Sequence, residues 1–224
     1  DWYERILRLD PAVAGADYML EPKLDGLTVV LTYENGLFTL GATRGDGLVG
    51  EDITENLKTV PMLPLRIPIS SDLQAPSRLV VRGEALIFKE DFERLNTELE
   101  KRGEKTYLNP RNTAAGSLRQ LDPTVTAKRP IKIYVYQILV SSEEIPPTQS
   151  GILNYLKTLG FPVNPLSWKA ANIEEAIAIC EEQAVSRHTW PYDADGIVIK
   201  VNDQRLSTLL GFAGKDPRSA LAFK

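Results

Sequence analysis

Four charged residues lie in or beside apolar segments of the sequence, and together they could bind a phosphate group. Lys23 belongs to the run Lys23-Leu24-Asp25-Gly26, directly before an apolar segment, and Arg44 follows the next such segment. Glu84 and Lys200 each stand inside an apolar segment. A charged side chain in an apolar strand costs free energy unless it is paired or faces a site. These positions therefore indicate a polar site that several strands share.

A cluster of Lys23, Arg44, Lys200 and Lys224 would repel itself unless an anion binds, and phosphate is the natural anion. A lysine amine attacks only in its neutral form, which neighbouring cations favour. The remaining cations would neutralise charge that develops on the phosphate oxygens, a task that a divalent metal usually shares. Such a site is suited to the covalent transfer of a nucleotide to a lysine.

Two further side chains could hold the nucleoside, although plainer interpretations exist. The carboxylate of Glu84 could accept hydrogen bonds from ribose hydroxyls, and Tyr136 could stack on a base. Alternatively, the run that begins at Lys23 is a surface turn, and Glu84 and Lys200 form a buried salt bridge that joins two strands. The residue types alone leave these alternatives open.

A hairpin is the clearest local structure, and it would carry Arg44 toward Lys23. Asn35-Gly36 lies between two alternating runs, which predicts a two-residue turn in which both residues have a positive φ. The loop length predicts a register in which the opposed pairs are Tyr33–Phe38, Leu31–Leu40, Val29–Ala42 and Leu27–Arg44. One face would be apolar as far as Arg44, and the other would carry Thr28, Thr32, Thr39 and Thr43.

The remaining elements alternate irregularly, which favours an α+β fold with antiparallel sheets flanked by helices. Further strands are predicted over residues 79–88, 131–140 and 196–201. Helices are predicted over residues 91–101, 110–119, 150–159 and 173–184. Asn109 followed by Pro110 is typical of a helix start, and Asn172 with Glu175 resembles a capping box.

The composition is that of a globular protein with no membrane span. The chain has 224 residues, of which 43% are hydrophobic and 25% charged, and no stretch of 18 apolar residues occurs. The single cysteine cannot form an internal disulfide, and with only one histidine it cannot build a zinc site. This usage fits a reducing compartment.

The net charge of −4 hides a basic segment. Residues 101–132 contain eight lysines or arginines and only two acids. A basic segment in an acidic protein can mark a surface that faces a polyanion. On charge alone, chance clustering on a solvated face explains it equally well.

The motifs resemble those of a known family. Five runs occur in the order and rough spacing of the nucleotidyltransferase motifs of polynucleotide ligases: residues 21–26, 42–47, 81–84, 195–200 and 222–224. The stretch from Asn109 to Asp122 is more specific, because it closely resembles a signature of bacterial NAD-dependent DNA ligases that ATP-dependent ligases lack. The chain is therefore identified as similar to the adenylation domain of that family over essentially its whole length. The resemblance implies a nucleotidyltransferase (ATP-grasp-like ligase) fold.

The resemblance implies a role for each matching residue. Lys23 would attack the α-phosphorus of NAD, release nicotinamide mononucleotide and hold AMP through a phosphoramide bond. Glu21 would contact the adenine edge and Tyr136 would stack on the ring. Arg44 and Glu84 would hold the ribose, and Asp25 would orient the lysine or a metal. The phosphate would be bound by Lys200 and Lys224.

The resemblance also implies partners and missing parts. AMP would pass to the 5′-phosphate of a nick in double-stranded DNA, and the 3′-hydroxyl would displace it. Arg111 and Arg119 would contact that DNA, which agrees with the basic segment around them. The expected cofactors are NAD and Mg²⁺ (or Mn²⁺), and a cytoplasmic monomer is expected. We expect residues 1–224 to be an excised adenylation domain whose upstream nicotinamide-binding part and downstream oligonucleotide-binding, zinc-finger, helix-hairpin-helix and BRCT parts lie elsewhere.

Two alternatives to this reading differ in class. An ATP-dependent ligase or capping-type nucleotidyltransferase shares the lysine motif but would release pyrophosphate. A non-catalytic remnant would bind nucleotide or DNA without turnover, although all the expected charged residues are present.

Overall fold

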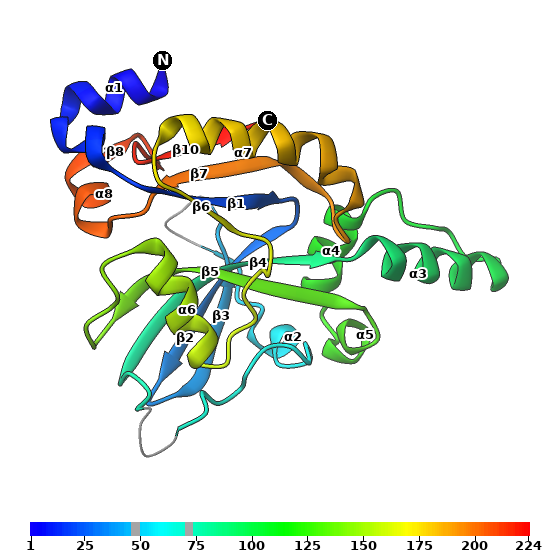
Figure 1. Ribbon diagram of the computed structural model, residues 1–224. Helices are drawn as coiled ribbons and strands as arrows, with labels where there is room; N and C mark the ends of the chain where they lie inside the picture. The colour runs from blue at the N-terminus through cyan, green and yellow to red at the C-terminus, as the bar shows by residue number, and fades with distance from the viewer. Residues whose placement is uncertain (46–49, 70–73) are drawn as a thin grey trace.

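Two four-stranded antiparallel sheets form the centre of the molecule in the computed structural model, which describes residues 1–45, 50–69 and 74–224 (Figure 1). The first sheet has the strand order β10-β7-β1-β6 and the second has the order β3-β2-β4-β5. Their bounds are β1 Tyr18–Leu24, β2 Leu27–Glu34, β3 Leu37–Thr43, β4 Arg78–Ile87, β5 Ile131–Ser141, β6 Trp168–Ala170, β7 Ala194–Val201 and β10 Ala220–Phe223. A short pair, β8 Phe212–Ala213 and β9 Asp216–Pro217, precedes β10. The predicted α+β class with antiparallel sheets is confirmed.

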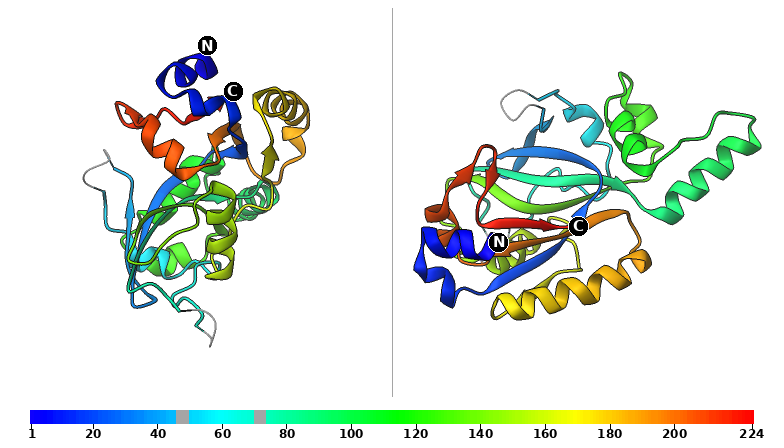
Figure 2. Two further views of the ribbon diagram at one scale, coloured as in Figure 1. Left: turned by 60° about the vertical axis from the view of Figure 1, so that its left-hand side comes forward. Right: turned by 90° about the horizontal axis from the view of Figure 1, so that it is seen from above.

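The helices cover the sheets and connect the strands. They are α1 Trp2–Leu9, α2 Thr54–Leu57, α3 Lys89–Lys101, α4 Pro110–Leu118, α5 Pro123–Ala127, α6 Gln149–Thr158, α7 Ile173–Ser186 and α8 Gln204–Leu210, with 3₁₀ turns at Pro11–Gly15 and Arg187–Thr189. Helix α7 lies along the first sheet, α6 packs beside β5, and α3 projects from the body (Figures 1 and 2). The predicted helix starts at Asn109 and Asn172 are confirmed, because each side chain accepts a hydrogen bond from a backbone N–H three residues later.

Each sheet has its own hydrophobic core. The first sheet buries residues such as Leu20 and Ile199 together with Cys180 of α7. The second sheet buries Leu31 and Val81 together with Leu156 of α6. Burial of apolar surface stabilises both units, at about 25 cal/mol per Å². The polar residues of the junction therefore lie between two packed cores.

The hairpin turn forms as predicted, but the predicted register is wrong beyond the first pair of residues. Asn35 and Gly36 have φ values of 50° and 74°, and Tyr33 pairs with Phe38. A bulge then inserts Thr39, so that Leu31 pairs with Gly41 and Val29 with Thr43 instead of with Leu40 and Ala42.

The bulge exchanges the faces of the second strand. Leu40 is 43% exposed, whereas Thr43 is 4% exposed, contrary to the predicted polar face that included Thr43. A Cβ at Gly41 would lie 2.3 Å from Leu57 Cδ1, so the glycine lets α2 pack closely against this strand. The alternation of apolar residues in the hairpin could not include this contact, because Leu57 belongs to α2 and lies outside the hairpin.

The chain crosses from the first sheet to the second at Asp25-Gly26, between β1 and β2. A Cβ at Gly26 would lie 2.2 Å from the carbonyl oxygen of Ala85 on β4. Only glycine therefore allows the crossing to pass this close to β4. The alternative that this run is a surface turn is wrong: it joins the two sheets and brings Lys23 to the junction between them.

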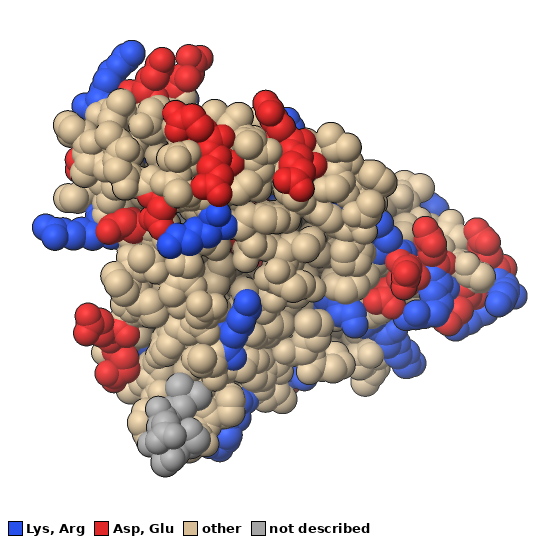
Figure 3. All heavy atoms as spheres, viewed as in Figure 1, with Lys and Arg blue, Asp and Glu red and all other residues tan. Residues whose placement is uncertain are grey.

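The surface charges are unevenly distributed. In Figure 3, acidic side chains gather over α7, and both signs mix on the projecting end that carries α3. No helix in residues 1–45, 50–69 and 74–224 is both long and apolar enough to cross a membrane.

Candidate functional site

Lys23 lies at a bulge that aims its side chain at Asp195. Pro22 pairs with Ile197 and Leu24 with Ala194, so Lys23 stands opposite two residues of β7, Asp195 and Gly196. Its Nζ lies 3.0 Å from Asp195 Oδ2, and both side chains are about one-third exposed. Bulges commonly redirect side chains next to sites, and here the bulge produces a charged pair at the sheet junction.

Gly196 also brings the end of the chain to this pair. Its φ is 143°, and a Cβ there would lie 2.0 Å from the carbonyl oxygen of Phe223. The end of β10 therefore approaches β7 closely, and exposed Lys224 lies near Asp195. The hydrogen bond from Lys23 lowers the pKa of Asp195, and the charges of Lys23, Lys224 and Arg111 lower it further. Asp195 is thus an ionised carboxylate among three cations.

Asp25 pairs with Arg111 on the other side of the crossing. Asp25 Oδ1 lies 3.0 Å from Arg111 Nη1 of α4. The two residues border an open cavity of about 490 Å³, which is also lined by Asn109, Pro110, Asn112 and Asp193. The start of α4 is therefore attached to the segment 23–26 that begins at Lys23. Arg111, one of the two arginines singled out from the sequence, makes this contact.

Glu84 faces the same junction from β4. It is 8% exposed, and it accepts hydrogen bonds from the Thr28 hydroxyl (3.0 Å) and from the Gly26 N–H. Desolvation by burial raises its pKa to about 7, although these hydrogen bonds and the charges of Arg111 and Lys23 act in the opposite direction. Glu84 does not pair with Lys200, so the proposed salt bridge between their strands is wrong.

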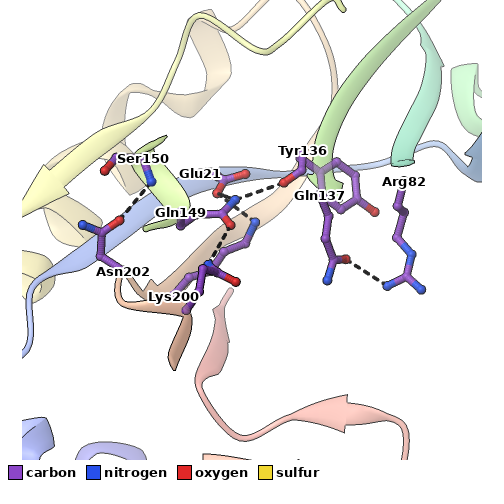
Figure 4. A network of polar contacts seen from close by, with 9 residues as sticks. Glu21, Arg82, Tyr136, Gln137, Gln149, Ser150, Lys200 and Asn202 are labelled. Carbon is purple, nitrogen blue, oxygen red and sulfur yellow. Dashed lines mark hydrogen bonds and ion pairs between the residues drawn. The ribbon is translucent and has the colours of Figure 1, made fainter. Parts of the chain in front are cut away.

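Lys200 pairs with Glu21 instead, at the far end of the site (Figure 4). Lys200 Nζ lies 2.8 Å from Glu21 Oε1 and 5.3 Å from the centre of the Tyr136 ring. Gln149 donates to the same Glu21 oxygen at 2.9 Å and to the Tyr136 carbonyl at 3.0 Å. Desolvation raises the pKa of Tyr136, and the charges of Glu84 and Glu21 raise it further, so its phenol is neutral and suited to stacking.

Arg44 borders this region from the end of β3. Its side chain is exposed, and its backbone N–H donates to the Thr28 carbonyl at 3.2 Å. Its positive charge acts to lower the pKa of Tyr136, against the larger effect of burial. The neighbouring positions Asp46 and Gly47, which belong to the same sequence motif, lie outside the described residues. The predicted residues Lys23, Arg44, Glu84, Lys200 and Lys224 thus line one junction instead of being scattered over the surface.

The charge balance differs from the predicted cluster of cations held together by a bound anion, because carboxylates of the protein pair with several of the cations. Lys23, Lys200 and Arg111 are each paired with a carboxylate at 2.8–3.0 Å. Two residues of this arrangement were missed by sequence reasoning. Asp195 was quoted within a motif without a role, and its position directly before a strand that carries Lys200 was the available signal. Gln149 carried no signal.

Arg119 lies at the other end of α4 and does not join this junction. Its Nε lies 2.5 Å from Glu51 Oε2, and both side chains are exposed. Arg111 and Arg119 therefore occupy opposite ends of one short helix and remain open to solvent.

The described residues do not build a metal site of their own. In residues 1–45, 50–69 and 74–224 no group of three or more His, Cys, Asp or Glu side chains could hold a metal ion. Asp25 and Asp195 are each engaged by a cation. Mg²⁺ commonly takes one or two carboxylates and completes its shell with water and substrate phosphates, so the protein alone supplies too few ligands here.

Known proteins resemble this chain over its whole length. The family model described as "NAD-dependent DNA ligase adenylation domain" matches residues 1–224. A DNA ligase of Desulfitobacterium hafniense (strain DSM 10664 / DCB-2) is 51% identical over 217 residues, which are 97% of this chain and 32% of that protein. A DNA ligase of Chloroflexus aurantiacus (strain ATCC 29366 / DSM 635 / J-10-fl) is 46% identical over 230 residues, covering 100% of this chain and 32% of that protein. The chain thus spans about a third of the length of these relatives.

The fold has solved counterparts. A structure of mycobacterial DNA ligase D complexed with ATP and MES superposes with a TM-score of 0.51 at 17% identity, over 94% of this chain and 56% of that chain. This likeness concerns the fold alone, and it confirms the predicted ligase-type nucleotidyltransferase architecture.

Proposed function

The chain belongs to the family of NAD-dependent DNA ligase adenylation domains, and we propose that Lys23 is the residue that accepts AMP from NAD. The Lys23 ammonium, which is paired with Asp195, first loses a proton to solvent. The neutral Nζ then attacks the α-phosphorus of NAD, and an N–P bond forms while the P–O bond to nicotinamide mononucleotide breaks. The leaving group departs with the electron pair, and the amine releases its remaining excess proton to solvent. The products are an AMP group on Lys23 and free nicotinamide mononucleotide.

The spacing of Glu21 and Lys23 on β1 is the observation that carries this proposal. Residues two apart on a strand share a face and lie about 6.5 Å apart. Glu21, with Lys200 and Tyr136 beside it, would take the adenine, while Lys23 would reach the phosphorus. Asp195 holds the Lys23 side chain in position at 3.0 Å.

The surrounding residues have supporting roles in this proposal. Glu84 and Arg44 would hold the ribose and its surroundings, because Glu84 presents a buried acceptor at the junction. Lys224 would neutralise charge on the phosphate oxygens, and Lys200 would reach the phosphate from its present place above Tyr136. Asp25 would orient the Lys23 run through its pair with Arg111.

The later steps involve DNA. AMP would pass from Lys23 to the 5′-phosphate of a nick, and the 3′-hydroxyl would displace it to seal the strand. Arg111 and Arg119 would contact DNA phosphates, since both are exposed, one at each end of α4, and Arg111 lies beside the junction. We also propose that this domain acts within a longer ligase, because relatives extend well beyond the matched region.

Magnesium or manganese would assist phosphoryl chemistry by neutralising phosphate charge. The described residues do not fit a complete protein-built metal site, so water and the substrate phosphates would supply most of the ligands of such an ion.

The test is adduct formation on Lys23 in the native protein that carries this domain. Incubation with NAD and Mg²⁺ should add one AMP group to Lys23, detected by mass spectrometry, with release of nicotinamide mononucleotide. Lys23→Ala should abolish the adduct, whereas Lys58→Ala, at an exposed lysine paired with Glu55, should leave it unchanged. Pyrophosphate release from ATP in place of this reaction would favour the ATP-dependent alternative, and the absence of any adduct would favour the non-catalytic one.

A further inference from the structure

Gln149 occupies a buried place at the start of α6, although no sequence motif includes it. Its side chain is 5% exposed, and its backbone N–H donates to the Asn202 carbonyl at 2.7 Å. The next residue, Ser150, donates its N–H to the Asn202 side chain at 2.9 Å. The helix start is therefore anchored to the end of β7, and Gln149 points from it toward Glu21 (Figure 4).

The amide of Gln149 has one favourable orientation. Its Nε2 donates to Glu21 Oε1 at 2.9 Å and to the Tyr136 carbonyl at 3.0 Å, which uses both amide hydrogens. Its Oε1 faces Gln204 Nε2 at 3.4 Å. The opposite orientation would set the amide oxygen against a carboxylate and a carbonyl, so the partners fix the amide.

The two carboxylate oxygens of Glu21 have different surroundings. Oε1 accepts from both Gln149 and Lys200, at 2.9 and 2.8 Å. In the part of the chain that the structure describes, no hydrogen-bond donor contacts Oε2. The carboxylate is therefore held by one oxygen and presents the lone pairs of the other to a ligand.

We propose that Gln149 is a positioning residue that sets the base specificity of the site by holding Glu21 in this orientation. This proposal rests on the proposed function. A 6-aminopurine donates a hydrogen bond to a carboxylate oxygen, whereas a 6-oxopurine places an acceptor there and is repelled. A site built to accept a hydrogen bond rejects the analogue that lacks the donor, provided that the acceptor cannot turn away.

The experiment compares NAD with its deaminated analogue, which carries hypoxanthine, in the native protein. In Gln149→Leu, kcat/KM for AMP transfer to Lys23 should fall roughly 10- to 100-fold with NAD and less than about threefold with the analogue. The preference for NAD would then drop by roughly 3- to 100-fold. Gln204→Leu removes only the longer contact on the other side of the amide, and it should keep the wild-type preference.

A second variant tests the proposal even if Gln149→Leu does not fold. Gln149→Glu is nearly isosteric and sets a second carboxyl against Glu21, so the pair would retain a proton that can be donated to a 6-oxo group. Its preference should shift toward the analogue, and more strongly at lower pH. An equal loss with both substrates, or an unchanged preference in both variants, would overturn the proposal.

A binding measurement separates this proposal from the proposed function. The ratio of AMP to IMP affinity, measured by titration calorimetry, needs no turnover. If the wild type forms no adduct, the proposed function fails, while a fall of this ratio in the Gln149 variants would still support the positioning role. If the adduct forms and the ratio does not change, only the positioning role fails.

Discussion

Replacement of Glu84 by Gln should remove a pH dependence of folding stability that this buried carboxyl creates. Burial raises its pKa from 4.5 to about 7, so the folded protein favours the neutral form. A carboxyl with a raised pKa contributes stability that is complete below the unfolded value and is lost as the pH rises through the folded value. The window therefore runs from about pH 4.5 to above pH 7.

The magnitude follows from the size of the shift. The difference between 4.5 and about 7 corresponds to roughly 3 kcal/mol of unfolding free energy over the whole window, at about 1.4 kcal/mol per pKa unit. Most of this change falls between pH 5 and pH 8. A glutamine is neutral throughout, and its side-chain oxygen can still accept from Thr28 and the Gly26 N–H. Relative to wild type, Glu84→Gln should therefore gain about 2–3 kcal/mol between these pH values.

Denaturant titration at pH 5 and pH 8 measures the effect as the difference in unfolding free energy between variant and wild type. Glu55→Gln is the matched control, because Glu55 is an exposed carboxylate paired with Lys58, and its difference should be the same at both pH values. A Glu84→Gln difference that does not change with pH, or that changes in the opposite direction, would refute the assignment of a desolvated carboxyl at this position.

Three other predictions test the Lys23–Asp195 pair, the two exposed arginines at the ends of α4 and the close approach at Gly196. Asp195→Asn should slow AMP transfer to Lys23 roughly 10- to 100-fold with little change in KM for NAD, in rapid-quench assays, because the amine loses the carboxylate that holds it. Arg111→Ala and Arg119→Ala should each reduce the magnitude of the negative slope of log affinity for nicked DNA against log salt by about one. An unchanged slope would exclude the phosphate contact. Gly196→Ala should destabilise the fold by roughly 2–4 kcal/mol in denaturant titration, because a Cβ there would lie 2.0 Å from a backbone oxygen at a φ of 143°.

Local sequence patterns predicted the elements well where the interactions that form them join residues close together in the sequence. Asn35-Gly36 forms the predicted turn because the two residues themselves provide the positive φ values. Asn109 caps α4 through a backbone N–H three residues away. These features depend on neighbours in the chain, so a single sequence contains the information needed to predict them.

Register and packing were predicted less well because distant residues decide them. The bulge at Thr39 shifts the pairing of β3 so that Gly41, instead of Leu40, meets Leu57 of α2. The second bulge, opposite Lys23, sets Asp195 against the lysine. Periodicity alone assumes an uninterrupted ladder, and one inserted residue exchanges the faces of everything beyond it.

The pairing of charges shows the same limit and explains how the site avoids the repulsion that a cluster of cations would create. Lys23 and Asp195 are 172 residues apart, and Lys200 and Glu21 are 179 residues apart, so only the fold reveals that they meet. Each carboxylate balances the charge of the lysine beside it. Coulomb attraction at 2.8–3.0 Å holds each lysine beside its carboxylate and offsets the repulsion between the cations. The residues that reasoning from the sequence grouped by their common charge are therefore assembled by residues of the opposite charge, and Asp195 and Glu21 are as necessary to the geometry as Lys23 and Lys200.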